Sequence, residues 1–101
     1  MSNYFNWSTS TIDFEDYRYN FVKKGSFYIL DFYFKPFSTY TGNKTIFTIS
    51  TGYRPKYNTY VSIGSSTNVY GFYAQLYTNG NCIISGSITA SKPYAGKIIY
   101  I

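Results

Sequence analysis

The chain has 101 residues, nine of them basic and four acidic, and its formal charge is +5. This length supports one hydrophobic core and excludes two independent ones, so we expect a single domain over residues 1–101. The chain lacks histidine, which excludes Ser-His-Asp and Cys-His catalysis, and its one cysteine, Cys82, excludes an intramolecular disulfide. We therefore expect no enzymatic activity, no cofactor and no metal site, and we expect Cys82 to be buried.

The composition predicts an all-β fold. Tyrosine and phenylalanine contribute 14 and 9 residues, and strong helix formers are scarce. Aromatic and β-branched side chains fit the half-buried surface of a sheet. The predicted strands are short and closely spaced, which indicates an antiparallel β-sandwich or a jelly-roll-like barrel without significant helix.

The distribution of basic residues argues against a nucleic-acid partner. They are scattered, and Lys23-Lys24 is the one run. Aromatic residues mixed with basic ones also occur in proteins that bind single strands, which keeps that alternative open. We expect no signal peptide before Tyr4, and no apolar run approaches the ~18 residues that a membrane span needs, so we also expect no membrane insertion.

We expect an extended N-terminal arm over residues 1–8, and residues 4–14 to form a weak strand or an extended arm. Trp7, the sole tryptophan, is interpreted as a core or interface anchor, with a ligand platform as the alternative. An acidic cluster follows. A carboxylate pair is typical of glycosidases, but here we expect solvated loop residues, namely Asp13, Glu15 and Asp16.

Residues 17–23 and 26–35 predict a hairpin around Lys24-Gly25, because glycine supplies the unusual dihedral of a tight turn. A two-residue loop pairs Tyr19 with Leu30, Phe21 with Tyr28, and Arg18 with Asp31. The longer strand is apolar on both faces, so it either lies centrally in a sandwich or meets another subunit.

Pro36 ends that strand, and residues 38–43 form a polar loop before a strand at 45–51. The tetrapeptide Gly52-Tyr53-Arg54-Pro55 then forms a turn between two β halves, since glycine can adopt positive φ and proline withholds a donor. We expect a structural role for this turn. The Arg54 guanidinium should hydrogen-bond carbonyls or a carboxylate across a subunit boundary, with direct ligand contact as the alternative.

A strand at residues 60–64 follows, and residues 69–78 and 81–85 form the clearest hairpin, joined by Asn79-Gly80, the preferred pair of a type I′ turn. This turn pairs Leu76 with Ile83 and Tyr77 with Cys82 and directs Tyr73, Gln75 and Tyr77 away from the core. Residues 86–96 are rich in turn formers, and 97–101 form a last strand. The two hairpin registers predict a core that includes Tyr19, Phe21, Tyr28, Leu30, Phe32, Phe47, Ile49, Phe72, Leu76 and Ile83.

The order of these features resembles a known family. An N-terminal Trp7, the turn at Lys23-Lys24-Gly25, the Gly52-Tyr53-Arg54-Pro55 turn and the later Thr78-Asn79-Gly80-Asn81 are similar to the C-terminal domains of tail-fibre and baseplate proteins from phages and prophages of Gram-positive bacteria. The resemblance covers nearly the whole chain. It implies a homotrimeric domain in the virion, at the phage tail, which contacts other tail or baseplate proteins and recognises a host cell-wall saccharide at the bacterial surface. The alternatives are a trimerisation or docking module of a tail protein without its own ligand, and a bacterial adhesin domain.

We expect the ligand site where loops and outward-facing aromatics meet. Sugars have apolar ring faces and hydroxyl rims, so they require an aromatic platform beside amide and hydroxyl groups. The alternative is that these tyrosines decorate a polar surface or fill a subunit interface. The candidates are Tyr40, Asn43, Tyr57, Asn58, Tyr73 and Tyr77.

Overall fold

The computed structural model describes residues 4–65 and 68–101, without the side chains of Ser62, Ser65 and residues 68–73. The described residues form strands and turns and include no helix, so the predicted all-β fold is confirmed. In chain order the strands are β1 (Phe5–Trp7), β2 (Phe14–Lys24), β3 (Phe27–Pro36), β4 (Tyr40–Thr41), β5 (Lys44–Ile49), β6 (Thr59–Ser65), β7 (Asn68–Leu76), β8 (Asn81–Ile84), β9 (Ser87–Ile88) and β10 (Tyr94–Tyr100).

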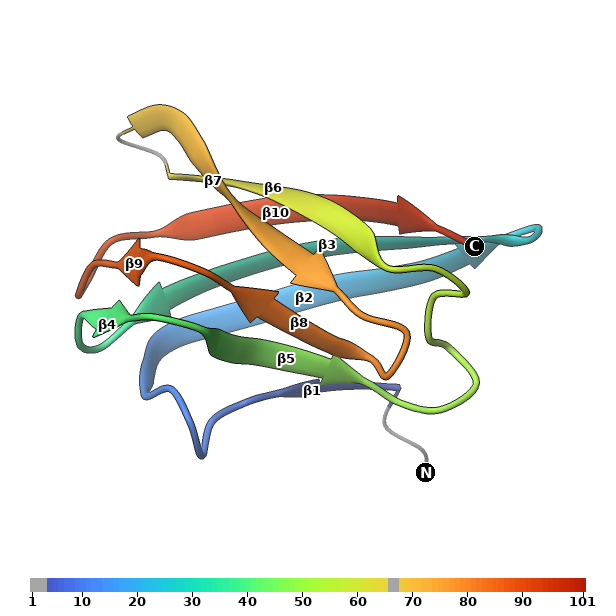
Figure 1. The fold of residues 1–101 in the computed structure, drawn as a ribbon, viewed down its shortest axis with the longest axis horizontal. Helices are drawn as coiled ribbons and strands as arrows, with labels where there is room; N and C mark the ends of the chain where they lie inside the picture. The colour runs from blue at the N-terminus through green and yellow to red at the C-terminus, as the bar shows by residue number, and fades with distance from the viewer. Residues whose placement is uncertain (1–3, 66–67) are drawn as a thin grey trace.

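These strands build an antiparallel sandwich. Within the described chain, one eight-stranded sheet has the order β1-β5-β8-β7-β6-β10-β3-β2, and β4 pairs with β9 in a separate two-stranded sheet. Figure 1 shows the large sheet curling so that β5, β8 and β7 lie in front of β10, β3 and β2. The predicted antiparallel β-sandwich therefore arises from one sheet folded over its own apolar face.

The two ends of the large sheet meet through aromatic rings. The ring of Phe5 on β1 stacks on Tyr19 of β2 at 4.1 Å between centroids, and Trp7 lies 5.6 Å from Tyr17. Trp7 also contacts Phe34 and Phe47, so it packs as an anchor between the layers. Side chains rather than backbone pairing join the two sheet ends, because the described order places β1 and β2 at opposite edges.

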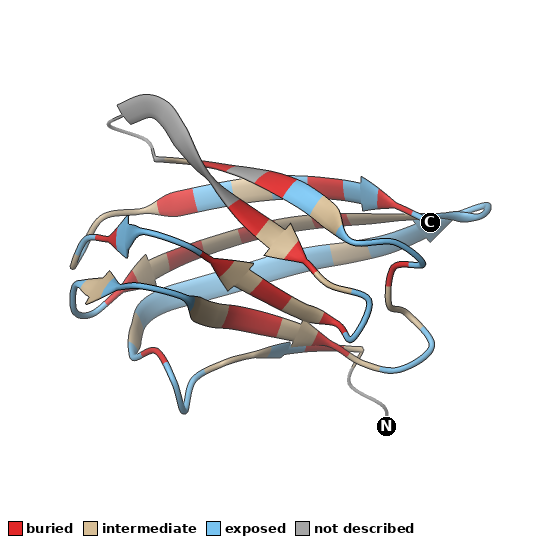
Figure 2. Ribbon diagram, in the orientation of Figure 1, coloured by how far each residue is buried: buried red, intermediate tan, exposed pale blue. Residues whose placement is uncertain are grey.

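The core lies between the two layers, and buried positions alternate along the strands (Figure 2). On β3 the side chains of Leu30, Phe32 and Phe34 are buried, whereas the opposite face is half-buried. A bulge in β5 between Thr45 and Phe47 interrupts the alternation and buries both Ile46 and Phe47. The doubly apolar strand predicted at residues 26–35 is thus an inner strand, paired with β2 and β10.

The first hairpin has a different turn from the one predicted. Its two-residue loop is Gly25-Ser26, because Lys24 pairs with Phe27, and Gly25 has φ of +60°. Positive φ at the first loop residue alone is typical of a type II′ turn. The expected pairs were therefore wrong by two residues, and the structure pairs Tyr19 with Phe32, Phe21 with Leu30, and Arg18 with Tyr33. The face of each side chain is unchanged, because a shift of two preserves the alternation.

The second hairpin differs by one residue. Gln75 pairs with Ile83 and Leu76 with Cys82, and the Tyr77 N–H bonds the Asn81 carbonyl at 2.9 Å. Gly80 is the one loop residue with positive φ, so the loop is a three-residue turn rather than a type I′ pair. A shift of one residue in the pairing reverses the faces of β8. Cys82 is therefore buried, and Ile83, which was predicted for the core, faces outward.

The predicted core is correct in its centre. Leu30, Phe32, Phe47, Ile49 and Leu76 are buried. Phe21, Tyr28 and Ile83 are half-buried, and the side chain of Phe72 lies outside the described residues. Tyr19 was predicted incorrectly, since 40% of it is exposed. It belongs to the edge strand β2, and the three-residue strand β1 is too short to cover it.

The predicted N-terminal arm and acidic loop are partly strands. Residues 5–7 of the arm form β1 and pair with β5. Glu15 and Asp16 belong to β2 instead of a loop, and both are exposed. Glu15 accepts a hydrogen bond from the Ser91 hydroxyl at 2.8 Å and lies 3.5 Å from the Lys35 ammonium, which lowers the pKa of its carboxyl.

Candidate functional site

The turn at residues 52–55 is held from within the chain. Gly52 has φ of +98°, and Pro55 is buried. The Tyr53 ring packs against Tyr4 with 5.5 Å between centroids. Arg54 donates from Nε to the backbone carbonyl of Ile49 at 2.8 Å. The guanidinium therefore bonds a carbonyl of its own chain, at the end of β5.

This turn meets the Asn79-Gly80 turn in space. The N–H of Ile49 donates to the Gly80 carbonyl at 2.8 Å, while the Ile49 carbonyl accepts from Arg54. A Cβ at Gly80 would overlap the Ile49 carbonyl oxygen and lie 2.8 Å from Arg54 Nε. Only glycine fits there, since its φ is also +91°. The two most distinctive turns of the sequence thus form one contact around Ile49.

Three of the six predicted ligand residues do not line the groove that contains Asn43 and Tyr77. Tyr40 is half-buried on β4, and its hydroxyl oxygen accepts the Asp13 N–H at 2.7 Å. The Asn58 Oδ1 accepts the Thr78 N–H at 3.0 Å, which joins the loop before β6 to the turn after β7. Tyr57 is 71% exposed. The side chain of a fourth, Tyr73, lies outside the described residues.

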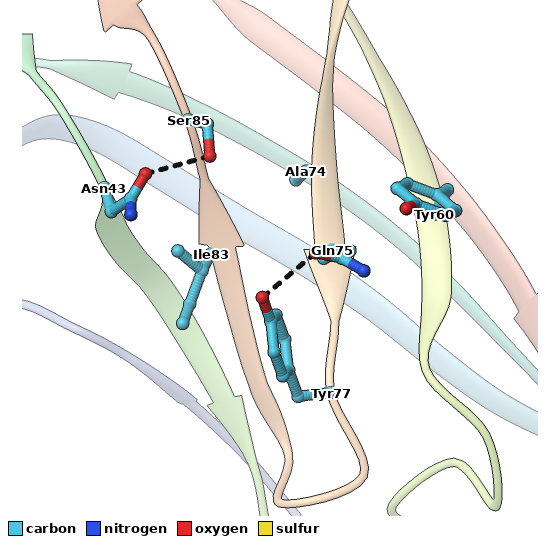
Figure 3. Close-up of a pocket in the computed structure, with 7 residues that line it drawn as sticks. All are labelled: Asn43, Tyr60, Ala74, Gln75, Tyr77, Ile83 and Ser85. Atoms are coloured by element: carbon cyan, nitrogen blue, oxygen red, sulfur yellow. Dashed lines mark hydrogen bonds between the residues drawn. The ribbon is translucent and has the colours of Figure 1, made fainter.

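The other two, Asn43 and Tyr77, line one groove on the outer face of the front layer (Figure 3). This outer groove encloses about 310 Å³. Five further residues complete its lining: Tyr60, Ala74, Gln75, Ile83 and Ser85. The predicted hairpin directs Gln75 outward, but the sequence pattern does not connect Gln75 with the other six residues.

Strand pairing assembles the outer groove. Gln75 of β7 lies between Tyr60 of β6 and Ile83 of β8 as their register partner, which makes a row across three strands. Figure 3 shows the Tyr60 ring on one side of Gln75 and the Tyr77 ring on the other. Tyr60 is 73% exposed, so its ring is open to a ligand. Three consecutive strands therefore create an aromatic and aliphatic surface.

Two hydrogen bonds orient the amides of the outer groove. The Ser85 hydroxyl donates to Asn43 Oδ1 at 2.9 Å, and the Tyr77 hydroxyl donates to Gln75 Oε1 at 3.0 Å (Figure 3). Each amide oxygen is thereby occupied. The NH₂ groups of Asn43 and Gln75 have no partner among the described residues, so they are available as donors.

The outer groove is electrically neutral, since no charged side chain lines it within the described part of the chain. It combines tyrosine rings, the aliphatic Ile83 and polar hydroxyl and amide groups. Such a surface can contact the apolar face of a ring and donate hydrogen bonds to its substituents.

Metal binding and thiol chemistry have little support in the described residues. No group of three or more His, Cys, Asp or Glu side chains is placed to hold a metal ion there. Cys82 is fully buried, and burial raises the pKa of its thiol, which makes it unreactive. Within the same residues, no helix is long and apolar enough to span a bilayer.

Comparison with known proteins adds no assignment: no family model and no curated protein sequence matches the chain. The resemblance to phage tail-fibre and baseplate domains stays a prediction from motifs. The main observation that bears on function is the geometry of the outer groove.

Proposed function

We propose that this domain binds a neutral saccharide in the outer groove and acts as a receptor-binding domain of a phage tail or baseplate protein. In this proposal it is carried on the virion and contacts a host cell-wall saccharide at the bacterial surface. The observation that carries the binding step is the pair of amide NH₂ groups on Asn43 and Gln75, which have no partner among the described residues and lie beside the exposed ring of Tyr60. The virion location rests on the motif resemblance alone.

The chemistry of the outer groove fits a saccharide better than a charged or wholly apolar ligand. Pyranose rings present C–H groups on one face and hydroxyl oxygens around the rim. Tyr60 and Ile83 suit the face, and the two amides suit oxygens that accept hydrogen bonds. A groove this shallow buries little ligand surface, so each site should bind weakly, and several copies on one virion would compensate through avidity.

Two tyrosines with nearly equal exposure provide the test. Tyr60 is 73% exposed and lines the outer groove, whereas Tyr57 is 71% exposed and does not. Tyr60→Ala should weaken binding to purified host wall polysaccharide by about tenfold, since loss of one stacking ring is worth about 1.4 kcal/mol. Tyr57→Ala should bind like wild type. Equal binding by both folded variants would reject the outer groove as the site.

The proposed oligomer is a homotrimer that buries a second surface. Val22 of β2, Ile29 of β3 and Ile99 of β10 form a row across the outer face of the back layer, and Val22 and Ile99 are 36% and 58% exposed. Phe27 and Ile101 extend it and are 51% and 43% exposed. A patch of this kind is typical of an interface. The choice of three copies comes from the family resemblance.

This apolar row also favours a second candidate function, a trimerisation or docking module that contacts other tail proteins. Ile99→Asp should shift the mass measured by light scattering at micromolar concentration from trimer to monomer. A wild-type chain that is monomeric there would contradict the trimer. If the wild type is trimeric but binds no wall polysaccharide, the assembly role replaces the receptor-binding role.

A further inference from the structure

A second cavity lies at the tip of the β2–β3 hairpin. Figure 1 shows this tip at the opposite end of β2 from its start. It encloses about 400 Å³. We call it the hairpin pocket. Its lining consists of Lys23, Ser26, Tyr28, Gly52, Arg54, Lys56 and Ile101.

The hairpin pocket gathers positive charge from two parts of the chain. Lys23 comes from β2, whereas Arg54 and Lys56 come from the loop between β5 and β6. None of the four acidic side chains lines it, and the one carboxylate in the lining is the terminal group of Ile101. Three cations and one carboxylate leave the lining with a net positive charge, which a bound anion would balance.

The acidic residues are engaged elsewhere. Glu15 lies 3.5 Å from Lys35, and Asp16 lies 3.9 Å from Arg18. The remaining strand acid, Asp31, is the register partner of Lys97 on β10. The side-chain carboxylates thus neutralise the start and the middle of β2 and β3, and the hairpin pocket keeps a net positive charge.

The cations of the hairpin pocket are partly fixed. The Nε of Arg54 is bound to the Ile49 carbonyl, which orients the guanidinium plane and leaves its two NH₂ groups as donors. The Lys23 ammonium lies 5.5 Å from the centre of the Tyr28 ring. The N–H of Lys56 donates to an oxygen of the Ile101 terminal carboxylate at 3.1 Å, which holds the loop against the end of the last strand. Because the frame is in place before a ligand arrives, binding costs little ordering.

We propose that the hairpin pocket binds a phosphate group. A planar arginine fork pairs with two oxygens of a tetrahedral oxyanion, and two ammonium groups and the Ser26 hydroxyl can contact the others. A carboxylate has two oxygens and would leave part of this donor set unused. The site is separate from the outer groove, and it does not depend on saccharide binding.

The test uses two probes on the whole chain, inorganic phosphate and the phosphodiester of two glycerols, followed by backbone amide shifts in NMR titrations. Shifts at Lys23, Ser26 and Lys56 with either probe support the proposal. Binding of both probes indicates a site for the phosphate group itself, and binding of the diester alone indicates a phosphate within a larger molecule. No shift at these residues with millimolar concentrations of either probe would overturn it.

Adjacent lysines provide the matched control. Lys23→Gln and Lys56→Gln remove charge from the lining, whereas Lys24→Gln removes the same charge from a neighbouring residue that does not line the pocket. Each lining variant should weaken phosphate binding about tenfold, and Lys24→Gln less than about twofold. If all three variants weaken phosphate binding equally, the phosphate responds to the general positive potential of the surface, and a specific site in the hairpin pocket is rejected. Lys23, Lys24 and Lys56 are all exposed, so the three variants should keep the wild-type melting temperature.

Discussion

Replacing Gly80 by alanine tests the contact between the two distinctive turns. Alanine at φ of +91° carries a backbone cost of about 1–2 kcal/mol. Its Cβ would also overlap the Ile49 carbonyl. This overlap would displace the two hydrogen bonds of Ile49, one with Arg54 and one with the residue 80 carbonyl. Loss of these bonds adds about 1 kcal/mol for the backbone pair and about 1.5 kcal/mol or more for the charged one. Gly80→Ala should therefore destabilise the domain by about 4 kcal/mol.

Gly52→Ala is the matched control, because its φ is +98° but a Cβ there would meet no atom within 4 Å. It should cost only the backbone term, about 1–2 kcal/mol. Urea unfolding followed by the fluorescence of Trp7, the one tryptophan, measures both. Equal losses of stability in the two variants would refute the contact. A second check is the double variant of Gly80→Ala with Arg54→Ala, which should lose less than the sum because both changes disrupt the Ile49 carbonyl.

Four further predictions follow from particular contacts. Arg54→Ala should lower the unfolding free energy by about 1.5–3 kcal/mol, measured in urea, because it leaves the Ile49 carbonyl without its donor; wild-type stability would contradict this. Gly96→Ala should cost about 1–3 kcal/mol in the same assay, because the added Cβ would lie 2.5 Å from the buried Phe32 ring; an unchanged midpoint would disprove the close packing. Cys82 should react with a thiol reagent at mildly alkaline pH only at the rate of unfolding, since burial raises its pKa; fast labelling of the folded chain would show an open core. The pKa of Glu15 is lowered by the Ser91 hydroxyl, so its ionised form stabilises the fold above its unfolded pKa, and this contribution is lost as pH falls through the folded value. Glu15→Gln should therefore reduce the fall in melting temperature between about pH 5 and 3. If that fall is the same as in the wild type, the Glu15–Ser91 hydrogen bond is contradicted.

The alternation of side chains was sufficient to predict most faces of the long strands. The first hairpin shows why, since its turn lies one residue later than expected and all pairs shift by two, which leaves Leu30 and Phe32 inside. The second hairpin shows the limit. Its Gly80 closes a three-residue loop, and the shift of one moves Ile83 from the predicted core to the outer face.

The outer groove was only partly predictable, for a different physical reason. Asn43 and Tyr77 could be chosen as outward polar groups from local pattern alone. Tyr60 and Ser85 could not, because Tyr60 joins the row only through the pairing of β6 with β7, and Ser85 meets Asn43 only because the distant strands β5 and β8 pair. Which strands pair is decided by contacts between distant parts of the chain, and local alternation contains no signal for it.

The amide NH₂ signals of the outer groove provide the most direct test of saccharide binding. Gln75 is the only glutamine of the chain, so its side-chain signal in a ¹H–¹⁵N spectrum can be assigned simply. Titration with a neutral oligosaccharide from the host wall should shift the NH₂ signals of Gln75 and Asn43, while that of Asn20, exposed on β2, stays unchanged. A saccharide that binds the chain without moving the Gln75 and Asn43 signals would contradict the proposed site.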